Sequence, residues 1–437
     1  MSEIIRKTVS VCPNCLKRTD AEIILRDDSN IYMQKRCSDC GEFEALVWEG
    51  DKESYLDWGA PLNSRSFTAP DMPKRVDKGC PYDCGLCAAH KNSGCCVLLE
   101  LTKRCNLRCP VCFASAAEGE CEKDPSLGEI ETWFFMLSSY GRPFNIQLSG
   151  GEPSLRDDLP EIMDLGRRYG FSFFQLNTNG LRLAEEPEFA EELRKAGLGC
   201  VFLQFDSLTD EPYTALRGRH LLSHKLKAIE NAEKAGLPVV LVPTLVDGLN
   251  LHELGDIIKF GLERSPHIRG VHLQPMSEMG RFEFRNKKRI SIPKLINSIV
   301  EGTGGLMKYE DFTGGSSEHP YCSIHAAYII KPDGSLKALE PSSGCGCSCD
   351  NSRDFVASRW GKSNDSFEKH ADGFDEFLDK AVLNTFTVSS MLFQDAWNLD
   401  LERLKYCYLM EFDPERGLVP FCAYNLTNSK GEALYRK

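Results

Sequence analysis

The stretch LTKRCNLRCPVCFASA, residues 101–116, places three cysteines at short spacings at the end of the apolar segment VLLELT (97–102). Three residues separate Cys105 from Cys109, and two separate Cys109 from Cys112. Three thiolates hold three irons of a [4Fe–4S] cluster, and the fourth iron then stays open for another ligand. A structural zinc site would need a fourth protein ligand close by. The triplet therefore predicts a cluster with an open iron.

The triplet opens a regular alternation of apolar strands and amphipathic helices. The predicted strands lie at 97–102, 144–150, 171–177, 201–207, 239–245 and 270–276, and helical spacing is clearest at 159–170, 187–199, 223–236 and 251–265. Such an alternation predicts a parallel sheet with right-handed crossovers. We therefore predict an α/β fold, a partial (β/α)6 TIM-like barrel, with its polar motifs at the carboxyl ends of the strands, where such folds place their active sites.

The remaining cysteine groups suggest how the chain is organised. We expect a β-rich metal knuckle at 1–70, an auxiliary iron–sulfur segment at 71–96, the barrel at 97–290 and a C-terminal cysteine-containing extension at 291–437. In the knuckle, two strands surround the DDSN turn and EFEALVW forms a third. In the extension, 328–339 predicts a hairpin around Asp-Gly, and 385–406 predicts an amphipathic helix.

A second motif, SGGEP (149–153), follows the second predicted strand. CNLRCPVCF followed by SGGEP resembles the radical S-adenosylmethionine (radical SAM) superfamily. The resemblance implies that the open iron chelates the methionine part of S-adenosylmethionine and that the backbone of the Gly-Gly-Glu segment meets its amino group. The expected cofactor-binding residues are Ser149, Gly150, Gly151, Glu152, Asn177, Thr178, Asn179, Asp206, Ser207 and Gln274, although those after the third, fourth and sixth strands also favour ordinary turns.

The resemblance also implies a mechanism. An electron donor such as ferredoxin or flavodoxin reduces the cluster, S-adenosylmethionine is cleaved, and a 5′-deoxyadenosyl radical abstracts hydrogen from the substrate. Oxygen destroys such clusters, so an anaerobic host is expected. No residue is assigned a catalytic role. Many members have an aromatic residue just before the third cysteine, whereas this chain has Val111 there and Phe113 after it, so we expect adenine to be packed differently.

Three further metal centres are expected. Cys12, Cys15, Cys37 and Cys40 form two Cys-x2-Cys knuckles that are typical of a four-thiolate site for zinc or a single iron. Cys80, Cys84 and Cys87, with Cys95 or Cys96 as a fourth ligand, predict a closed auxiliary [4Fe–4S] cluster, beside which His90 is a surface or hydrogen-bonding residue unless it ligates. A third cluster would draw together Cys322, Cys407, Cys422 and one of Cys345, Cys347 and Cys349, unless these are buried free thiols. Cys121 and Cys200 read as ordinary single cysteines.

Composition narrows the classes of function. The formal charge of -12 argues against a broad basic surface for nucleic acid. No apolar run approaches the roughly 20 residues of a membrane span. The first residues lack the apolar core of a signal peptide, so we expect a cytoplasmic protein. Among its 20 cysteines, those grouped in close pairs and triplets are then expected to bind metal and not to form disulfides.

The order of all these motifs resembles one branch of the superfamily over nearly the whole chain. That branch contains the archaeal tetraether lipid synthases and the 7,8-dihydro-6-hydroxymethylpterin methyltransferases. It implies carbon–carbon bond formation or methylation of a lipid or pterin-like metabolite. Two departures are CYLM at 407–410, where Cys-Cys-x-His is expected, and the added GCGCSC. The alternatives are a peptide-modifying radical SAM maturase with auxiliary clusters and a non-catalytic multi-cluster electron carrier.

Overall fold

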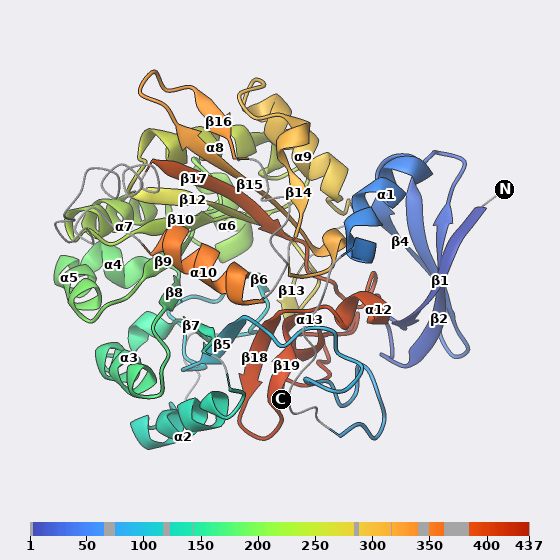
Figure 1. Ribbon diagram of the computed structural model, residues 1–437, viewed down its shortest axis with the longest axis horizontal. Coiled ribbons are helices and arrows are strands. Elements are labelled where there is room, and N and C mark those ends of the chain that lie inside the picture. Colours follow the sequence, from blue (N-terminus) through green and yellow to red (C-terminus); the bar gives the residue numbers. More distant parts are fainter. Residues whose placement is uncertain are drawn as a thin grey trace.

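An antiparallel sheet in the order β1-β2-β3-β4 begins the chain in the computed structural model, which describes residues 3–64, 75–116, 123–141, 143–283, 288–315, 317–339, 349–361 and 384–436. The last three strands are the predicted ones, and the first was not predicted. The sheet stands at one side of the molecule (Figure 1). Its bounds, with the helices that follow, are β1 (Glu3–Val11), β2 (Arg18–Leu25), β3 (Ile31–Cys37), β4 (Gly41–Trp48), α1 (Lys52–Gly59) and η1 (Ala60–Ser64).

The six strands predicted for the barrel are all present and parallel. They lie in the order β12-β10-β9-β8-β7-β5 within one larger sheet. Their residues are mostly buried, as expected for a parallel sheet covered by helices. The predicted α/β fold with a partial barrel is therefore confirmed. The strands are β5 (Cys96–Glu100), β7 (Asn145–Ser149), β8 (Phe174–Thr178), β9 (Cys200–Gln204), β10 (Val239–Val242) and β12 (Ile268–Pro275).

Helices connect these strands and cover the outside of the sheet (Figure 1). The four helices expected from apolar spacing correspond to α3, α5, α7 and α8. Ser126 begins α2 with a capping box to Glu129, which satisfies backbone donors at the first turn. The bounds are α2 (Leu127–Ser138), η2 (Pro153–Leu155), α3 (Leu159–Arg168), α4 (Leu181–Glu185), α5 (Pro187–Lys195), α6 (Asp210–Arg217), α7 (Leu222–Lys234), η3 (Leu251–Glu253), α8 (Leu254–Glu263) and α9 (Ile292–Gly302).

Strands from the C-terminal part of the chain extend the parallel sheet at both edges. β17 runs parallel to β12, and β18 runs parallel to β5. The predicted hairpin at 328–339 is present as the antiparallel pair of β15 and β16. The bounds are η4 (Tyr309–Asp311), β14 (Thr313–Gly314), η5 (Pro320–Cys322), β15 (Ser323–Ile330), β16 (Leu336–Ala338), β17 (Thr385–Met391), α12 (Leu401–Leu404), β18 (Leu409–Asp413), β19 (Gly417–Pro420) and α13 (Phe421–Tyr424).

The amphipathic helix predicted at 385–406 is wrong. Thr385–Met391 forms β17, which lies between β12 and β15, and only Leu401–Leu404 is helical. A strand buried on both faces loses the alternation that marks a half-exposed strand. Its apolar residues then fit a helical period by chance, although TFTVSSM is rich in β-branched residues, which favour strands.

Short elements complete the barrel. β6 (Val111–Cys112) pairs with β13 (Arg281–Phe282), and β11 (Thr244–Leu245) pairs with the end of β12. α10 (Cys349–Trp360) packs its Trp360 among residues at the amino ends of the strands. Among the described helices, none is long and apolar enough to cross a membrane.

We predict that Gly255→Ala lowers the free energy of unfolding by about 1–3 kcal/mol, because an added methyl would overpack the contact between α8 and α9. A Cβ on Gly255 would lie 2.0 Å from the backbone carbon of Gly302. Urea denaturation measures the change. Gly128→Ala is the matched control, since a Cβ there meets nothing within 4 Å; equal stabilities of the two variants would contradict the prediction.

Candidate active site

The three cysteines of the catalytic motif lie in the loop after β5. Val111 and Cys112 form β6, and its pairing with β13 fixes the end of the loop. Arg281 donates from Nε to the carbonyl oxygen of Cys109 at 2.7 Å. All three cysteines are partly buried. The pairing of β6 with β13 and the hydrogen bond from the Arg281 side chain therefore hold the C-terminal part of this loop in place.

The Gly-Gly-Glu segment packs directly against this loop. Gly151 N–H donates to the carbonyl of Thr102 at 2.8 Å, and Glu152 N–H donates to the carbonyl of Arg104 at 2.8 Å. A Cβ on Gly150 would lie 2.3 Å from the Thr102 oxygen, and one on Gly151 would lie 2.2 Å from the Arg104 oxygen. The two glycines thus let two backbone segments touch, which is a use that the sequence did not reveal.

The Glu152 carboxylate joins the ends of two neighbouring strands. Its side chain is buried, with 1% of the residue exposed. It accepts hydrogen bonds from Thr178 Oγ1 at 2.7 Å, from Asn179 N–H at 2.7 Å and from Ser154 N–H at 3.0 Å. Asn179 in turn donates to Asn106 Oδ1 in the cysteine loop at 2.7 Å. These hydrogen bonds join protein groups to one another, so Glu152 links the ends of β7 and β8 to the cysteine loop.

A cavity of about 240 Å³ opens beneath these loops. No fourth cysteine lies in its lining among the described residues, so the donor set fits a cluster with one open iron. The predicted residues that line it are Cys105, Cys109, Cys112, Ser149, Gly150, Gly151, Glu152, Asn177, Thr178, Asn179 and Gln274.

Two predicted residues do not line the cavity. Asp206 is buried and pairs with Arg217, at 2.8 Å to Nε and 2.9 Å to Nη2. Ser207 donates to Glu253 Oε2 at 2.6 Å, outside the cavity. Arg217 itself lines the cavity. Burial alone would lower the pKa of Arg217, but the carboxylate of Asp206 more than offsets this, so the guanidinium stays charged beside the cysteines.

Sequence reasoning missed Arg217 and the side chains inside the barrel. Arg217 ends α6 in an ordinary helical context, and nothing local marks it. The interior residues His272 and Gln147 lie at alternating positions within predicted strands, so the period-2 pattern would have placed them inward once the barrel was assumed. Phe113 also lines the cavity, beside Phe421 and Phe393, with successive ring centroids 5.4 and 4.4 Å apart.

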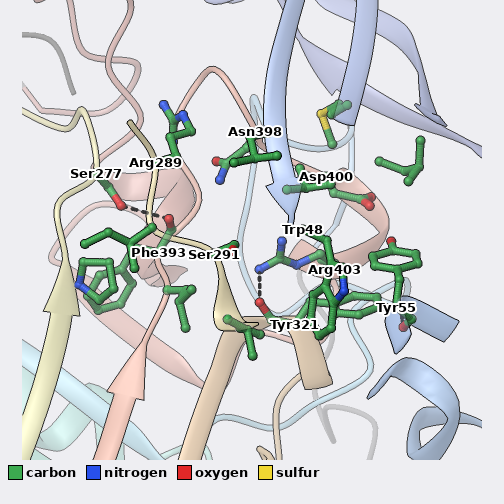
Figure 2. A pocket seen from close by; sticks show the side chains of 18 of the residues that line it. Trp48, Tyr55, Ser277, Arg289, Ser291, Tyr321, Phe393, Asn398, Asp400 and Arg403 are labelled. Atoms are coloured by element: carbon green, nitrogen blue, oxygen red, sulfur yellow. Dashed lines mark hydrogen bonds between the residues drawn. The ribbon is translucent and has the colours of Figure 1, made fainter. Parts of the chain in front are cut away.

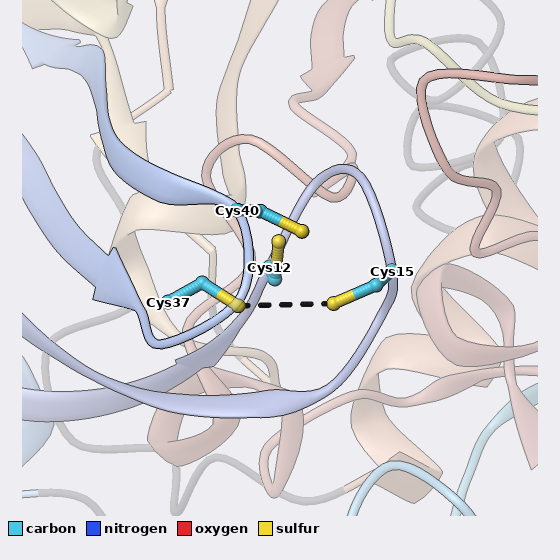
Figure 3. Close-up of side chains that lie close together, drawn as sticks. All are labelled: Cys12, Cys15, Cys37 and Cys40. Carbon is cyan, nitrogen blue, oxygen red and sulfur yellow. Dashed lines mark hydrogen bonds between the residues drawn. The ribbon is translucent and has the colours of Figure 1, made fainter.

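The four N-terminal cysteines form a compact metal centre (Figure 3). Cys12, Cys15, Cys37 and Cys40 place their sulfur atoms within 4.8 Å of one another, the only such group among the described residues. The Cys15 and Cys37 sulfurs are 3.8 Å apart. Hydrogen bonding from the backbone of Asp39 lowers the pKa of Cys37 to about 7, which favours the thiolate that a metal needs. The arrangement fits one tetrahedrally bound ion.

Cys80, Cys84, Cys407 and Cys422 belong to one packed cluster with residues of β18, β19 and α13. The sulfurs of Cys80 and Cys84 are 3.6 Å apart. The hydrogen bond with Cys80, followed by burial, raises the pKa of Cys84 most, and the charges of Cys87 and Cys407 add to this effect. Cys96 points elsewhere: its sulfur accepts from Gln147 Nε2 at 3.0 Å.

Cys422 is buried, which raises its pKa, and Cys407 and Cys322 lie near enough to add to the effect. His90 Nε2 lies 2.8 Å from the carbonyl oxygen of Cys407, which supports a hydrogen-bonding role. Cys200 is buried in β9. Cys121, Cys345, Cys347 and the side chain of Cys349 lie outside the described residues.

A partial barrel that holds a three-cysteine loop against a Gly-Gly-Glu segment defines a radical SAM enzyme, and a family model described as the Radical SAM superfamily matches residues 99–261. The chain belongs to the radical SAM superfamily. It is 33% identical, over an alignment of 480 positions including gaps, to a 7,8-dihydro-6-hydroxymethylpterin dimethyltransferase of Methanocaldococcus jannaschii, with 96% of this chain and 93% of that protein covered. A second model, described as the HMPTM N-terminal zinc ribbon domain, matches residues 4–49.

A further relative matches the barrel region. A probable GTP 3′,8-cyclase of Pyrococcus abyssi is 33% identical over 187 residues, covering 43% of this chain and 59% of that protein. The solved structure of Streptococcus suis SuiB bound to S-adenosylmethionine aligns at 15% identity with a TM-score of 0.39, over 54% of this chain and 48% of that one. The sequence-based assignment to the superfamily is confirmed by the family model and the full-length relative.

We predict that Glu152→Gln lowers the free energy of unfolding by about 1–3 kcal/mol, because one end of the amide cannot accept the hydrogen bonds that the carboxylate now accepts. Urea denaturation of the purified variant measures this. Glu192→Gln, on the exposed face of α5, is the control and should stay within about 0.5 kcal/mol of wild type. An unchanged midpoint for Glu152→Gln would show that the network does not support the site.

His272 gives a pH-dependent prediction. Burial lowers the pKa of His272 to about 4 from the value of about 6.5 that it has in an unfolded chain. Between these values the unfolded chain binds the proton and the folded chain does not, so stability falls as the pH drops from about 6.5 towards 4. Replacing His272 with Phe should remove about 1–3 kcal/mol of that loss, measured as the difference between the two stability curves. Curves of the same slope would contradict a buried neutral imidazole.

Proposed function

We propose that this chain is a radical SAM methyltransferase that acts on a small pterin-like metabolite. One observation carries the proposal: the three cysteines, the Gly-Gly-Glu segment and a cavity inside the barrel form one continuous site. The full-length relative is named for dimethylation of 7,8-dihydro-6-hydroxymethylpterin, which supports the substrate class.

Cys105, Cys109 and Cys112 would hold the [4Fe–4S] cluster. When bound and reduced by a donor such as ferredoxin or flavodoxin, the cluster with S-adenosylmethionine supplies a 5′-deoxyadenosyl radical. Arg217 keeps a positive charge at the cavity wall, where it can face the methionine carboxylate. The backbone of Gly150 to Glu152 lies at the same wall and can meet the amino group. Asp206 acts through Arg217, whose orientation it fixes.

Zinc is the metal we assign to Cys12, Cys15, Cys37 and Cys40, because the matching family model is described as a zinc ribbon. We assign auxiliary iron–sulfur binding to Cys80, Cys84 and Cys87, with Cys407 or Cys95 as the fourth thiolate. Cys407 is among the groups whose charge raises the pKa of Cys84. Cys322 and Cys422 remain candidate ligands of a further cluster beside them.

The reaction is tested with anaerobically reconstituted protein, S-adenosylmethionine and 7,8-dihydro-6-hydroxymethylpterin. We expect 5′-deoxyadenosine and, with a separate methyl donor such as a second equivalent of S-adenosylmethionine, a methylated pterin by mass spectrometry, because the cleavage leaves its own methyl group on methionine. We expect Cys109→Ala to lose at least about 100-fold of both, since it removes one of three cluster ligands. Cys200→Ala, a buried cysteine outside the cavity, is the matched control. Unchanged 5′-deoxyadenosine formation by Cys109→Ala would overturn the assignment.

The ribbon metal is tested by elemental analysis. Cys15→Ser should remove about one equivalent of zinc, the content of a single tetrahedral site, and leave the iron content unchanged. Iron in place of zinc in the wild-type protein, purified from medium that contains both metals, would contradict the zinc assignment.

A further inference from the structure

The catalytic cavity continues past the predicted cofactor residues into the barrel. Phe202 on β9 and His272 on β12 line its deeper part. Trp360 of α10 packs against both residues, with its ring centroid 4.9 Å from that of Phe202 and 6.1 Å from that of His272. The cavity is therefore lined here by two rings that a third ring supports.

His272 presents one polar atom to this space. Its Nδ1 lies 2.9 Å from Ser389 Oγ on the neighbouring strand β17, which fixes the ring. No described residue forms a hydrogen bond with its Nε2. Burial lowers the pKa of His272 to about 4, so the imidazole is neutral near pH 7. A neutral ring can offer either a donor or an acceptor at Nε2, as the ligand requires.

Two amides occupy the far wall of the same cavity. Gln147 on β7 accepts at Oε1 from Asn177 Nδ2 on β8 at 3.0 Å, and both line the cavity. β9 and β10 separate these strands from β12, so the amides and the imidazole lie across the barrel from each other. Gln147 Nε2 also donates to Cys96 Sγ at 3.0 Å, and Asn177 Oδ1 also accepts from Gln175 Nε2 at 2.9 Å. One N–H and one lone pair of each amide remain for a ligand.

Apolar side chains fill the walls between the two polar sides. Leu98, Val242 and Leu409 line the cavity along with Phe202. Polar groups at two sides and apolar surface between them match a flat ring that carries its donors and acceptors on its rim. A long alkyl chain would leave Nε2 of the imidazole and the remaining donors and acceptors of both amides without partners, at a cost in binding.

We propose that His272, held by Ser389, is the specificity-determining contact to the rim of a pterin ring, and that Gln147 and Asn177 hold the opposite rim. The inference rests on the proposed function and adds where the ring sits and which residue selects it. Ser389 is a positioning residue, since it acts through His272.

The test measures binding of 6-hydroxymethylpterin, the stable and fluorescent oxidised form, to the anaerobic holoenzyme. A set of analogues, each altered at one rim position, is titrated in parallel. His272→Phe should bind the parent pterin about tenfold more weakly, the loss expected for one buried hydrogen bond. One analogue should lack the rim group that contacts His272, and wild type should bind it more weakly than the parent pterin. His272→Phe should bind this analogue and the parent pterin equally well, because the variant cannot make that contact with either.

Companion variants separate contact from structure. His272→Gln should recover part of the affinity, and Ser389→Ala should weaken binding by about two- to fivefold. His252→Phe is the matched control, because the side chain of His252 is 73% exposed. Affinity within twofold of wild type in His272→Phe, or retention of every analogue penalty, would overturn the inference.

The outcomes also distinguish this inference from the proposed function. If wild type forms methylated pterin but His272→Phe binds pterin normally, only the assignment of His272 fails. If wild type forms 5′-deoxyadenosine but binds no pterin, both the pterin substrate and this inference are overturned, while the radical SAM assignment stands.

Discussion

The active site depends on a backbone-to-backbone contact between Gly150–Glu152 and Thr102–Arg104. Side chains at the two glycines would collide with carbonyl oxygens of the cysteine loop. Two hydrogen bonds across the contact then fix the loop relative to β7. The buried carboxylate of Glu152 extends this constraint to β8. The position of three cysteines is thus set by the neighbouring strands rather than by the loop itself.

Two buried basic residues, Arg217 and Lys225, lie near the cysteine loop. Arg217 is paired with Asp206, and Lys225 donates from Nζ to Gln204 Oε1 at 2.6 Å and to the carbonyl of Asn179. Burial lowers the pKa of Lys225 to about 7, although Asp206 opposes the shift. Arg217 therefore supplies a permanent positive charge beside a site that is expected to collect thiolates and a carboxylate, whereas Lys225 is only partly protonated near pH 7. Positive charge at this place favours the ionised form of each ligand.

The sequence predicted the six parallel strands, most of their helices and the residues at the strand ends, because apolar periodicity and short motifs are local signals. It did not predict β17, whose two faces are both buried, or the contacts of Arg217 and His272, which depend on segments far apart in the chain. Asp206 ends a strand as predicted but serves Arg217 and not the cavity. The grouping of Cys84 with Cys407 likewise depends on the C-terminal strands returning to β5. Contacts between segments so far apart in the chain cannot be predicted from the spacing of residues along the sequence.

The central claim is that Cys105, Cys109 and Cys112 hold a cluster whose open iron binds S-adenosylmethionine. The most direct measurement is electron paramagnetic resonance of the reduced protein in which Cys84 and Cys422 are both replaced by alanine, with and without S-adenosylmethionine. The account predicts a [4Fe–4S] signal that changes shape when S-adenosylmethionine is added. A signal that is unaffected by S-adenosylmethionine, or no cluster at all while the protein remains folded, would contradict it.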